Sequence, residues 1–189
     1  MLYTTITIRK ISMEKDIKDL KVLIDSKTLN NRIKALADEI NSSYNEKEPL
    51  TLICVLRGAA MFFCELAKYL KMPVKMEFVS LSSYGDNEKS SGKIKSCNLH
   101  LPSMNNENVL VVEDIVDTGL TLDFLIKFIQ MNCQAKDVKL AVLFDKKCAR
   151  KFDITPDFAA FEVDDKFIVG FGLDYCGFYR NLNYIGYFE

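Results

Sequence analysis

The stretch from Val109 to Leu122, VLVVEDIVDTGLTL, decides most of what the sequence predicts about the fold. It opens with four apolar residues, Val109–Val112, as expected of a strand buried on both faces of a sheet. Two carboxylates follow, and the loop Ile115–Gly119 leads into a predicted helix over Thr121–Met131 with apolar residues at helical spacing. A buried strand, a tight turn and a helix in this order are typical of one unit of an α/β protein.

Similar units extend along the chain on both sides of this stretch. The further predicted strands are Leu50–Leu56, Val74–Leu81, Val138–Phe144, Phe158–Val163 and Phe167–Phe171, and the further predicted helices are Leu29–Tyr44 and Ala59–Leu70. Ser26 or Thr28 is expected to cap the first helix. Because strands alternate with helices, the predicted fold class is α/β, with a mainly parallel, doubly wound sheet flanked by helices.

The composition is that of an ordinary globular protein. The 189 residues are 49% apolar and 27% charged, and at roughly 100–200 residues per domain they predict a single domain over 1–189. A net charge of −1 provides no basic field for nucleic acid. No apolar run reaches the roughly 18–20 residues of a membrane span, and the N-terminal MLYTTITIRK does not resemble a signal peptide.

Cysteine and histidine usage argues against a zinc site. The six cysteines form no C-x-x-C pair, and the chain has one histidine. The cysteines are therefore interpreted as reduced thiols, which predicts a cytoplasmic protein.

Two segments fit the α/β pattern less well. Residues 1–20 alternate weakly and then become charged, which leaves open an extra strand or an arm against a partner subunit. Ser82–Asn98 is polar and long, with hairpin character around Lys93–Leu101. Long loops in compact domains are usually functional or disordered, and this segment is expected to be one or the other.

Polar residues follow the predicted strands where ligands bind in open α/β sheets, beyond the carboxyl ends of the strands. The first strand is followed by Arg57-Gly58, the strand at Val109 by a group of carboxylates and threonines, and the fourth by Asp145-Lys146. Gly170, Asp174 and Arg180 lie near the last strand. The sequence therefore predicts one site at this edge of the sheet.

The junction around Gly119 predicts a phosphorylated sugar as ligand. Gly119 allows a tight turn into a helix whose N-terminus attracts anions, and Thr118 and Thr121 add hydroxyl donors for a phosphate. Three preceding carboxylates would repel a bare phosphate but suit sugar hydroxyls and a metal ion. A P-loop is excluded, since no lysine stands beside the glycine. On residue pattern alone, Asp114 and Asp117 could instead be turn and capping residues.

The segment Leu110–Leu122, LVVEDIVDTGLTL, closely resembles the thirteen-residue signature that binds 5-phosphoribosyl 1-diphosphate in the type I phosphoribosyltransferases. The acidic pair, the Asp-Thr-Gly and the closing Thr all match. The resemblance extends from about Val22 to Tyr187, and PDFAAFEVDDKFIVGFGLDYCGFYRNLNYIG at Pro156–Gly186 is similar to the hypoxanthine-guanine branch of that family. It implies the family fold, with a small hood subdomain from the terminal segments, and a homodimer or homotetramer.

The resemblance implies an enzyme of purine salvage. The expected reaction is the magnesium-dependent transfer of the 5-phosphoribosyl group to N9 of hypoxanthine or guanine, giving IMP or GMP and diphosphate. One alternative is a regulator that senses 5-phosphoribosyl 1-diphosphate without catalysis, although such regulators usually carry a nucleic-acid-binding surface. Another is a transferase that prefers xanthine.

The resemblance also implies which groups hold the activated sugar. Glu113 and Asp114 would hold the ribose 2′- and 3′-hydroxyls and help to place Mg²⁺, and Asp174 would bind a second Mg²⁺. The phosphate loop, defined here as Asp117–Thr121, would bind the 5′-phosphate through residues Asp117, Thr118, Gly119, Leu120 and Thr121.

The diphosphate has its own implied partners. Leu56-Arg57-Gly58 resembles the diphosphate-binding loop of the family, although many relatives carry Lys where this chain has Arg57. Arg and Lys share a charge but differ in hydrogen-bond geometry. Arg180 would contact the diphosphate, although on residue pattern alone it could be merely structural. Ser83-Tyr84 opens a segment that is similar to the family's mobile loop, and the resemblance therefore implies a mobile active-site loop over about 82–98.

The purine is implied to be bound by residues from the C-terminal part of the chain. Asp117 would lie near N7 and accept a proton as the catalytic residue, and Lys146 would donate to the 6-oxo group. Phe167 would stack on the base while the backbone of Ile168 reads its edge. On residue pattern alone, Phe167 and Ile168 are interpreted as part of a core strand. Lys146 stands beside Lys147, and on pattern alone such a lysine pair is interpreted as solvated surface.

Overall fold

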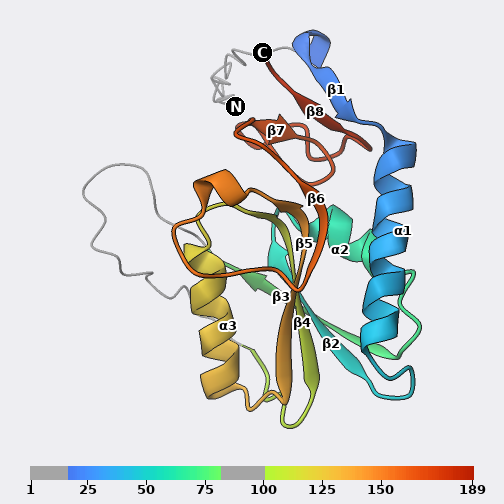
Figure 1. Ribbon diagram of the computed structural model, residues 1–189, viewed down its shortest axis with the longest axis vertical. Helices are drawn as coiled ribbons and strands as arrows, with labels where there is room; N and C mark the ends of the chain where they lie inside the picture. The colour runs from blue at the N-terminus through green and yellow to red at the C-terminus, as the bar shows by residue number, and fades with distance from the viewer. Residues whose placement is uncertain (1–16, 82–100) are drawn as a thin grey trace, which may run out of the picture.

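A computed structural model describes residues 17–81 and 101–189 of the chain (Figure 1). The larger sheet in these ranges has five parallel strands in the order β3-β2-β4-β5-β6. The strands are β2 (Leu50–Leu56), β3 (Val74–Ser80), β4 (Asn108–Val116), β5 (Asp137–Asp145) and β6 (Phe158–Glu162). The predicted doubly wound parallel sheet is confirmed.

Helices cover both faces of this sheet (Figure 1). Its helices are α1 (Ser26–Ser43), α2 (Ala60–Ala67) and α3 (Leu120–Asn132), with short 3-10 helices at Ile17–Asp19 and Lys147–Ala149. Leu52 and Leu110 pack in a core with α1 and α2, whereas Ile53 and Val111 pack in a second core with α3. Burial on both faces explains why these strands are continuous apolar runs.

The helix boundaries differ from the predicted ones for local reasons. α1 begins at Ser26, and its N-cap is Asp25 rather than Ser26 or Thr28. The Asp25 carboxylate accepts a hydrogen bond from the Thr28 amide at 2.8 Å, so the predicted capping residues lie inside the first turn. α2 ends at Ala67, short of Leu70, because the following amides bond to the third residue back in 3-10 fashion.

β4 is longer than the predicted strand Val109–Val112. It pairs with β5 in parallel as far as Val116, opposite Asp145. Glu113 and Asp114 therefore lie inside the strand, and the predicted loop Ile115–Gly119 shrinks to the residues after Val116. The pairing with β5 holds these carboxylates on a rigid element, although carboxylates are depleted from most strands.

A second, antiparallel sheet joins the two ends of the described chain. Its order is β1-β8-β7, with strands β1 (Lys21–Ile24), β8 (Ile185–Tyr187) and β7 (Ile168–Val169). This sheet is the predicted hood. β7 is shorter than the predicted strand Phe167–Phe171. The chain turns after Val169, because Gly170, Phe171 and Gly172 all have positive φ.

Some predictions fall outside the described residues. These are most of the predictions for 1–20, the mobile loop at about 82–98 and most of the hairpin at Lys93–Leu101. Within the two described ranges, none of the helices has the length and apolar character that a membrane span requires.

Candidate active site

The ends of three neighbouring strands bring the predicted polar residues to one edge of the larger sheet. β2 ends at Leu56 before Arg57-Gly58, β4 ends before Asp117, and β5 ends before Lys146. β2 lies between β3 and β4, so the chain winds in opposite directions from it. Ligands bind at such reversals of strand order.

A hollow of about 260 Å³ opens at this edge. Its walls come from the end of β2, from Leu81, from the last part of β4 and from the loop and first turn that follow β4. The lining residues are Val55, Leu56, Leu81, Glu113, Ile115 and Asp117–Leu122. The structure therefore gathers the whole phosphate loop and Glu113 around one space.

The phosphate loop turns sharply into α3 at Gly119. This residue is the N-cap of α3 and has a φ of +87°, a backbone conformation that residues other than glycine rarely adopt. A Cβ there would also lie 2.6 Å from the Cγ2 atom of Ile154. Because free N–H groups and the positive dipole end of a helix gather at this turn, the loop can bind an anion such as phosphate.

Glu113 and Asp114 form a desolvated pair of carboxyl groups. Asp114 is buried, and its Oδ1 accepts a hydrogen bond from the Ile115 amide at 2.7 Å. Burial raises the pKa of Glu113 well above its usual range, and the negative charge of Asp114 is the second cause. Burial also raises the pKa of Asp114. The buried Oε2 of Glu113 has no hydrogen-bond partner among the described residues. An orphaned acceptor of this kind suits a sugar hydroxyl or a hard cation.

The protein groups alone do not complete a metal site. Among residues 17–81 and 101–189, no three His, Cys, Asp or Glu side chains lie together as a potential metal cage. Magnesium commonly binds one or two carboxylates together with water and substrate phosphates. Glu113 and Asp114 fit that pattern, with the remaining ligands supplied by a phosphorylated substrate.

Replacing Glu113 by Gln should stabilise the free protein at neutral pH by on the order of 1 kcal/mol, because Gln carries no charge to be desolvated beside Asp114 and one unit of raised pKa corresponds to about 1.4 kcal/mol. The pKa of Glu113 is higher in the folded protein than in the unfolded chain, so protonation of this side chain stabilises the fold. The stabilisation is complete below the unfolded-state pKa of about 4.3. It is lost as the pH rises through the folded-state pKa. Thermal unfolding of both proteins between pH 4 and 8 measures the difference. A variant that gains nothing toward neutral pH would contradict the desolvation of Glu113.

Gly58 packs directly against Asp114. A Cβ at Gly58 would lie 1.5 Å from Asp114 Oδ2, and a Cβ at Gly172 would lie 1.9 Å from the carbonyl oxygen of Gly58. The segments after β2, within β4 and after β7 therefore meet without room for a methyl group. Arg57, which precedes this contact, is exposed and is joined to Leu56 by a cis peptide bond.

Asp174 and Arg180 lie together in the loop that follows β7. Arg180 Nη2 is 2.5 Å from Asp174 Oδ1, and Arg180 Nη1 donates to the carbonyl oxygen of Gly172 at 2.5 Å. The second carboxylate oxygen of Asp174 accepts from the Gly177 amide at 2.7 Å. The positive charge of Arg180 partly offsets the burial that raises the pKa of Asp114, so Arg180 acts electrostatically on this carboxyl group of β4.

Lys146 is held by a residue that the sequence did not single out. Its ammonium lies 2.6 Å from Asp165 Oδ1, and the Lys146 side chain is 15% exposed whereas that of Asp165 is 85% exposed. The bond to Asp165 is the main cause that raises the pKa of Lys146, and Asp117 adds to it. In the sequence Asp165 stands in an acidic turn, and only its place before Phe167 could have indicated a contact with the site.

Phe167 and Ile168 have different environments. Ile168 is buried in β7, but Phe167 is 56% exposed and touches Tyr175 edge to face at a centroid distance of 5.9 Å. The pattern-based interpretation as core strand therefore holds for Ile168 and is wrong for Phe167. An exposed aromatic face can stack on a planar ligand.

Ser83 and Tyr84 lie outside the described residues.

Comparison with known proteins defines the class. The family model described as a phosphoribosyl transferase domain matches residues 21–176. The chain belongs to the phosphoribosyltransferase family.

Individual relatives show which branch of this family the chain is similar to. The chain is 42% identical over 174 residues to the hypoxanthine-guanine phosphoribosyltransferase of Bacillus subtilis (strain 168), covering 92% of this chain and 94% of the relative. It is 42% identical over 165 residues to that of Aquifex aeolicus (strain VF5), covering 87% and 92%. A solved hypoxanthine-guanine phosphoribosyltransferase from Bacillus anthracis superimposes with a TM-score of 0.83 at 37% identity, covering 89% and 98%. The resemblance to this branch of the family is confirmed.

Proposed function

We propose that this protein transfers the 5-phosphoribosyl group of 5-phosphoribosyl 1-diphosphate to N9 of hypoxanthine or guanine. The products would be IMP or GMP and diphosphate, as in purine salvage. The observation that carries the proposal is the hollow that joins the carboxylate of Glu113 to the phosphate loop at the N-terminus of α3. The similarity to hypoxanthine-guanine phosphoribosyltransferases supports the choice of bases.

In this proposal the sugar and its 5′-phosphate bind across the end of β4. The amides and hydroxyls of the phosphate loop hold the 5′-phosphate, and Glu113 and Asp114 accept hydrogen bonds from the ribose hydroxyls. The orphaned Oε2 of Glu113 supports this role, since a hydroxyl donor would satisfy it. Bound Mg²⁺, held by Glu113 and Asp114 with a second ion at Asp174, would supply positive charge for the diphosphate.

The leaving diphosphate would face the positive groups on the β2 side of the hollow. Breaking the bond at C1′ leaves a cationic sugar and an anionic leaving group, so stabilising that anion lowers the barrier. Arg180 and the backbone of Arg57-Gly58 would provide this stabilisation. Arg180 is already fixed by Asp174 and the Gly172 carbonyl, which favours a preorganised contact.

The purine would lie between the phosphate loop and the hood. Asp117 is exposed at the hollow and would accept the proton from the base at N7. The nearly buried ammonium of Lys146 would donate to the 6-oxo group, the exposed ring of Phe167 would stack on the base, and the Ile168 backbone would contact its edge.

Self-association is part of the proposal, as a homodimer or homotetramer. Met61 on α2 and Met76 and Phe78 on the edge strand β3 are each at least two-fifths exposed, at 41%, 46% and 51%. Met76 and Phe78 stand two residues apart and therefore lie on the same face of the edge strand β3, which supports a protein partner there.

The acceptor is tested by incubating the protein with Mg²⁺, 5-phosphoribosyl 1-diphosphate and each of hypoxanthine, guanine, xanthine and adenine, while nucleotide absorbance is followed. We expect turnover with hypoxanthine or guanine and none with adenine. Faster turnover with xanthine would favour the xanthine-preferring alternative. Tight binding of the sugar donor without turnover would favour the regulatory alternative.

Replacing Lys146 by Met should raise the KM for hypoxanthine and guanine about tenfold to a hundredfold, because a hydrogen bond to a charged group contributes about 1.5–3 kcal/mol. The KM for 5-phosphoribosyl 1-diphosphate should change little. Lys147→Met is the matched control, since Lys147 pairs with Glu162 on the exposed surface. Equal effects of the two variants would argue against a base contact at Lys146.

A further inference from the structure

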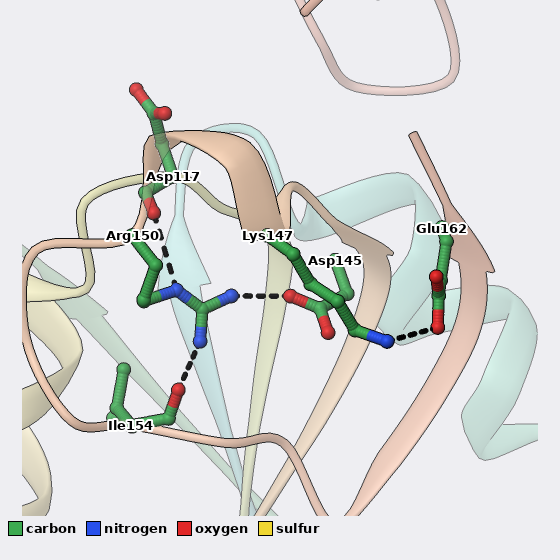
Figure 2. Close-up of polar contacts among 6 residues, drawn as sticks. All are labelled: Asp117, Asp145, Lys147, Arg150, Ile154 and Glu162. Carbon is green, nitrogen blue, oxygen red and sulfur yellow. Dashed lines mark hydrogen bonds and ion pairs between the residues drawn. The ribbon is translucent and has the colours of Figure 1, made fainter. Parts of the chain in front are cut away.

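A nearly buried arginine that the proposed mechanism does not use lies against the phosphate loop. The Arg150 side chain is 17% exposed and follows the short helix Lys147–Ala149. Its guanidinium forms an ion pair with the carboxylate of Asp145, which is itself only 5% exposed at the end of β5. It also donates to the backbone carbonyl of Ile154 and, through Nε at 3.3 Å, to that of Asp117 (Figure 2). One side chain thereby connects three segments.

The residues after Arg150 hold the next carbonyl of the loop. The Thr118 oxygen accepts hydrogen bonds from the amides of Lys151 at 3.0 Å and Phe152 at 3.1 Å. The Arg150 stem also packs under the turn, because a Cβ at Gly119 would lie 3.3 Å from Arg150 Cδ. Two successive carbonyls of the phosphate loop, at Asp117 and Thr118, are therefore fixed from the same side.

Fixing the carbonyls also fixes the amides that follow them. A trans peptide group is planar, with its C=O and N–H on opposite sides. When the carbonyls of Asp117 and Thr118 face Arg150–Phe152, the N–H groups of Thr118 and Gly119 face away from that segment. Figure 2 shows the Asp117 carboxylate on the side of its backbone away from the guanidinium. Thr118 and Gly119 line the hollow, so these amides are aimed at the space where an anion would bind.

We propose that Arg150, held by Asp145, is a positioning residue that orients the phosphate loop for the 5′-phosphate. This inference rests on the proposed function and adds a residue to it. Arg150 touches neither sugar nor base in this account and acts only through the backbone of Asp117 and Thr118. A planar guanidinium suits the role, because it can donate to three acceptors in fixed directions.

The test compares a ligand that has the phosphate with one that lacks it. Arg150→Met keeps the apolar stem but removes the guanidinium, and calorimetry measures the binding of GMP and guanosine to this variant and to the wild type. We expect GMP affinity to fall on the order of tenfold to a hundredfold, the effect of misplacing a binding group by about 1 Å. Guanosine affinity should change little, because guanosine makes no use of the phosphate loop amides.

Two further variants complete the test. Arg150→Lys keeps the charge beside Asp145 but cannot reach all three acceptors, so it should show the same selective loss at smaller size even if the Met variant fails to fold. Lys147→Met, which removes the exposed pair with Glu162 shown beside it in Figure 2, should bind both ligands as the wild type does.

The outcomes separate the two proposals. If the Arg150 variants lose affinity for both ligands equally, or for neither, while the wild type binds GMP, the positioning role is overturned and the proposed function stands. If the wild type binds neither GMP nor 5-phosphoribosyl 1-diphosphate, the proposed function fails and the inference fails with it.

Discussion

Replacing Asp117 by Asn is expected to lower kcat by about 10²–10⁴-fold, the usual contribution of a positioned proton acceptor. Asn has nearly the same shape as Asp but cannot take up a proton. Asp117 is exposed at the hollow, and its backbone is fixed separately by Arg150, so the substitution should leave the loop in place. The KM for 5-phosphoribosyl 1-diphosphate should therefore change much less than kcat.

Steady-state kinetics with both substrates provides the measurement, and Asp123→Asn provides the control. Asp123 lies in the first turn of α3 and pairs with Lys127 at 2.8 Å, so its loss removes a nearby carboxylate without touching the proposed chemistry. Equal losses of kcat and of substrate binding in the Asp117 variant would argue that Asp117 binds or orients the substrate and does not accept a proton.

Replacing Gly58 by Ala should have an effect of similar size, for a steric reason. The added methyl would lie 1.5 Å from Asp114 Oδ2, and Gly172 packs closely on the backbone carbonyl of Gly58. Asp114 is buried and bonded to the Ile115 amide, so either this carboxylate or the turn at Arg57-Gly58 must move. Overpacking of this kind typically costs about 1–3 kcal/mol of stability, and the shift should reduce kcat/KM on the order of a hundredfold.

Thermal unfolding and kcat/KM for the sugar donor measure the two parts of this prediction. Gly177→Ala is the matched control: Gly177 has a φ of +85° but no atom within 4 Å of its added Cβ. That variant should lose about 1–2 kcal/mol from backbone strain alone and retain activity. Near wild-type activity in Gly58→Ala would contradict the close packing of Gly58 against Asp114.

The elements of the larger sheet were predictable because burial leaves a clear pattern. Leu50–Leu56 is apolar apart from Thr51 since both of its faces are covered, and the predicted and observed bounds of β2 agree. β4 was predicted too short because its last part carries Glu113 and Asp114. Carboxylates at the end of a strand look like a loop when only composition is visible, whereas pairing with β5 keeps them in the strand.

The hood strands were harder to predict from sequence. β1, β7 and β8 are two to four residues long, too short for periodicity to identify. β1 finds its partner β8 at the other end of the chain, so only the resemblance to a family indicated a hood.

Most candidate site residues were visible in the sequence because they stand at strand ends, as Asp117 and Lys146 do. The residues that support them were not visible. Arg150 lies in KKCARK, which reads as solvated surface, and its contacts with Asp117 and Asp145 exist only after folding. The packing of Gly172 on Gly58 likewise joins segments that are far apart in the sequence.

The most direct test of the proposed transfer is to quantify both products of one reaction. The purified protein is incubated with Mg²⁺, 5-phosphoribosyl 1-diphosphate and hypoxanthine, and IMP and diphosphate are separated by anion-exchange chromatography. The account predicts IMP and diphosphate in equal amounts, with neither formed when hypoxanthine or Mg²⁺ is omitted. Diphosphate released without IMP, or no product with either hypoxanthine or guanine, would contradict it.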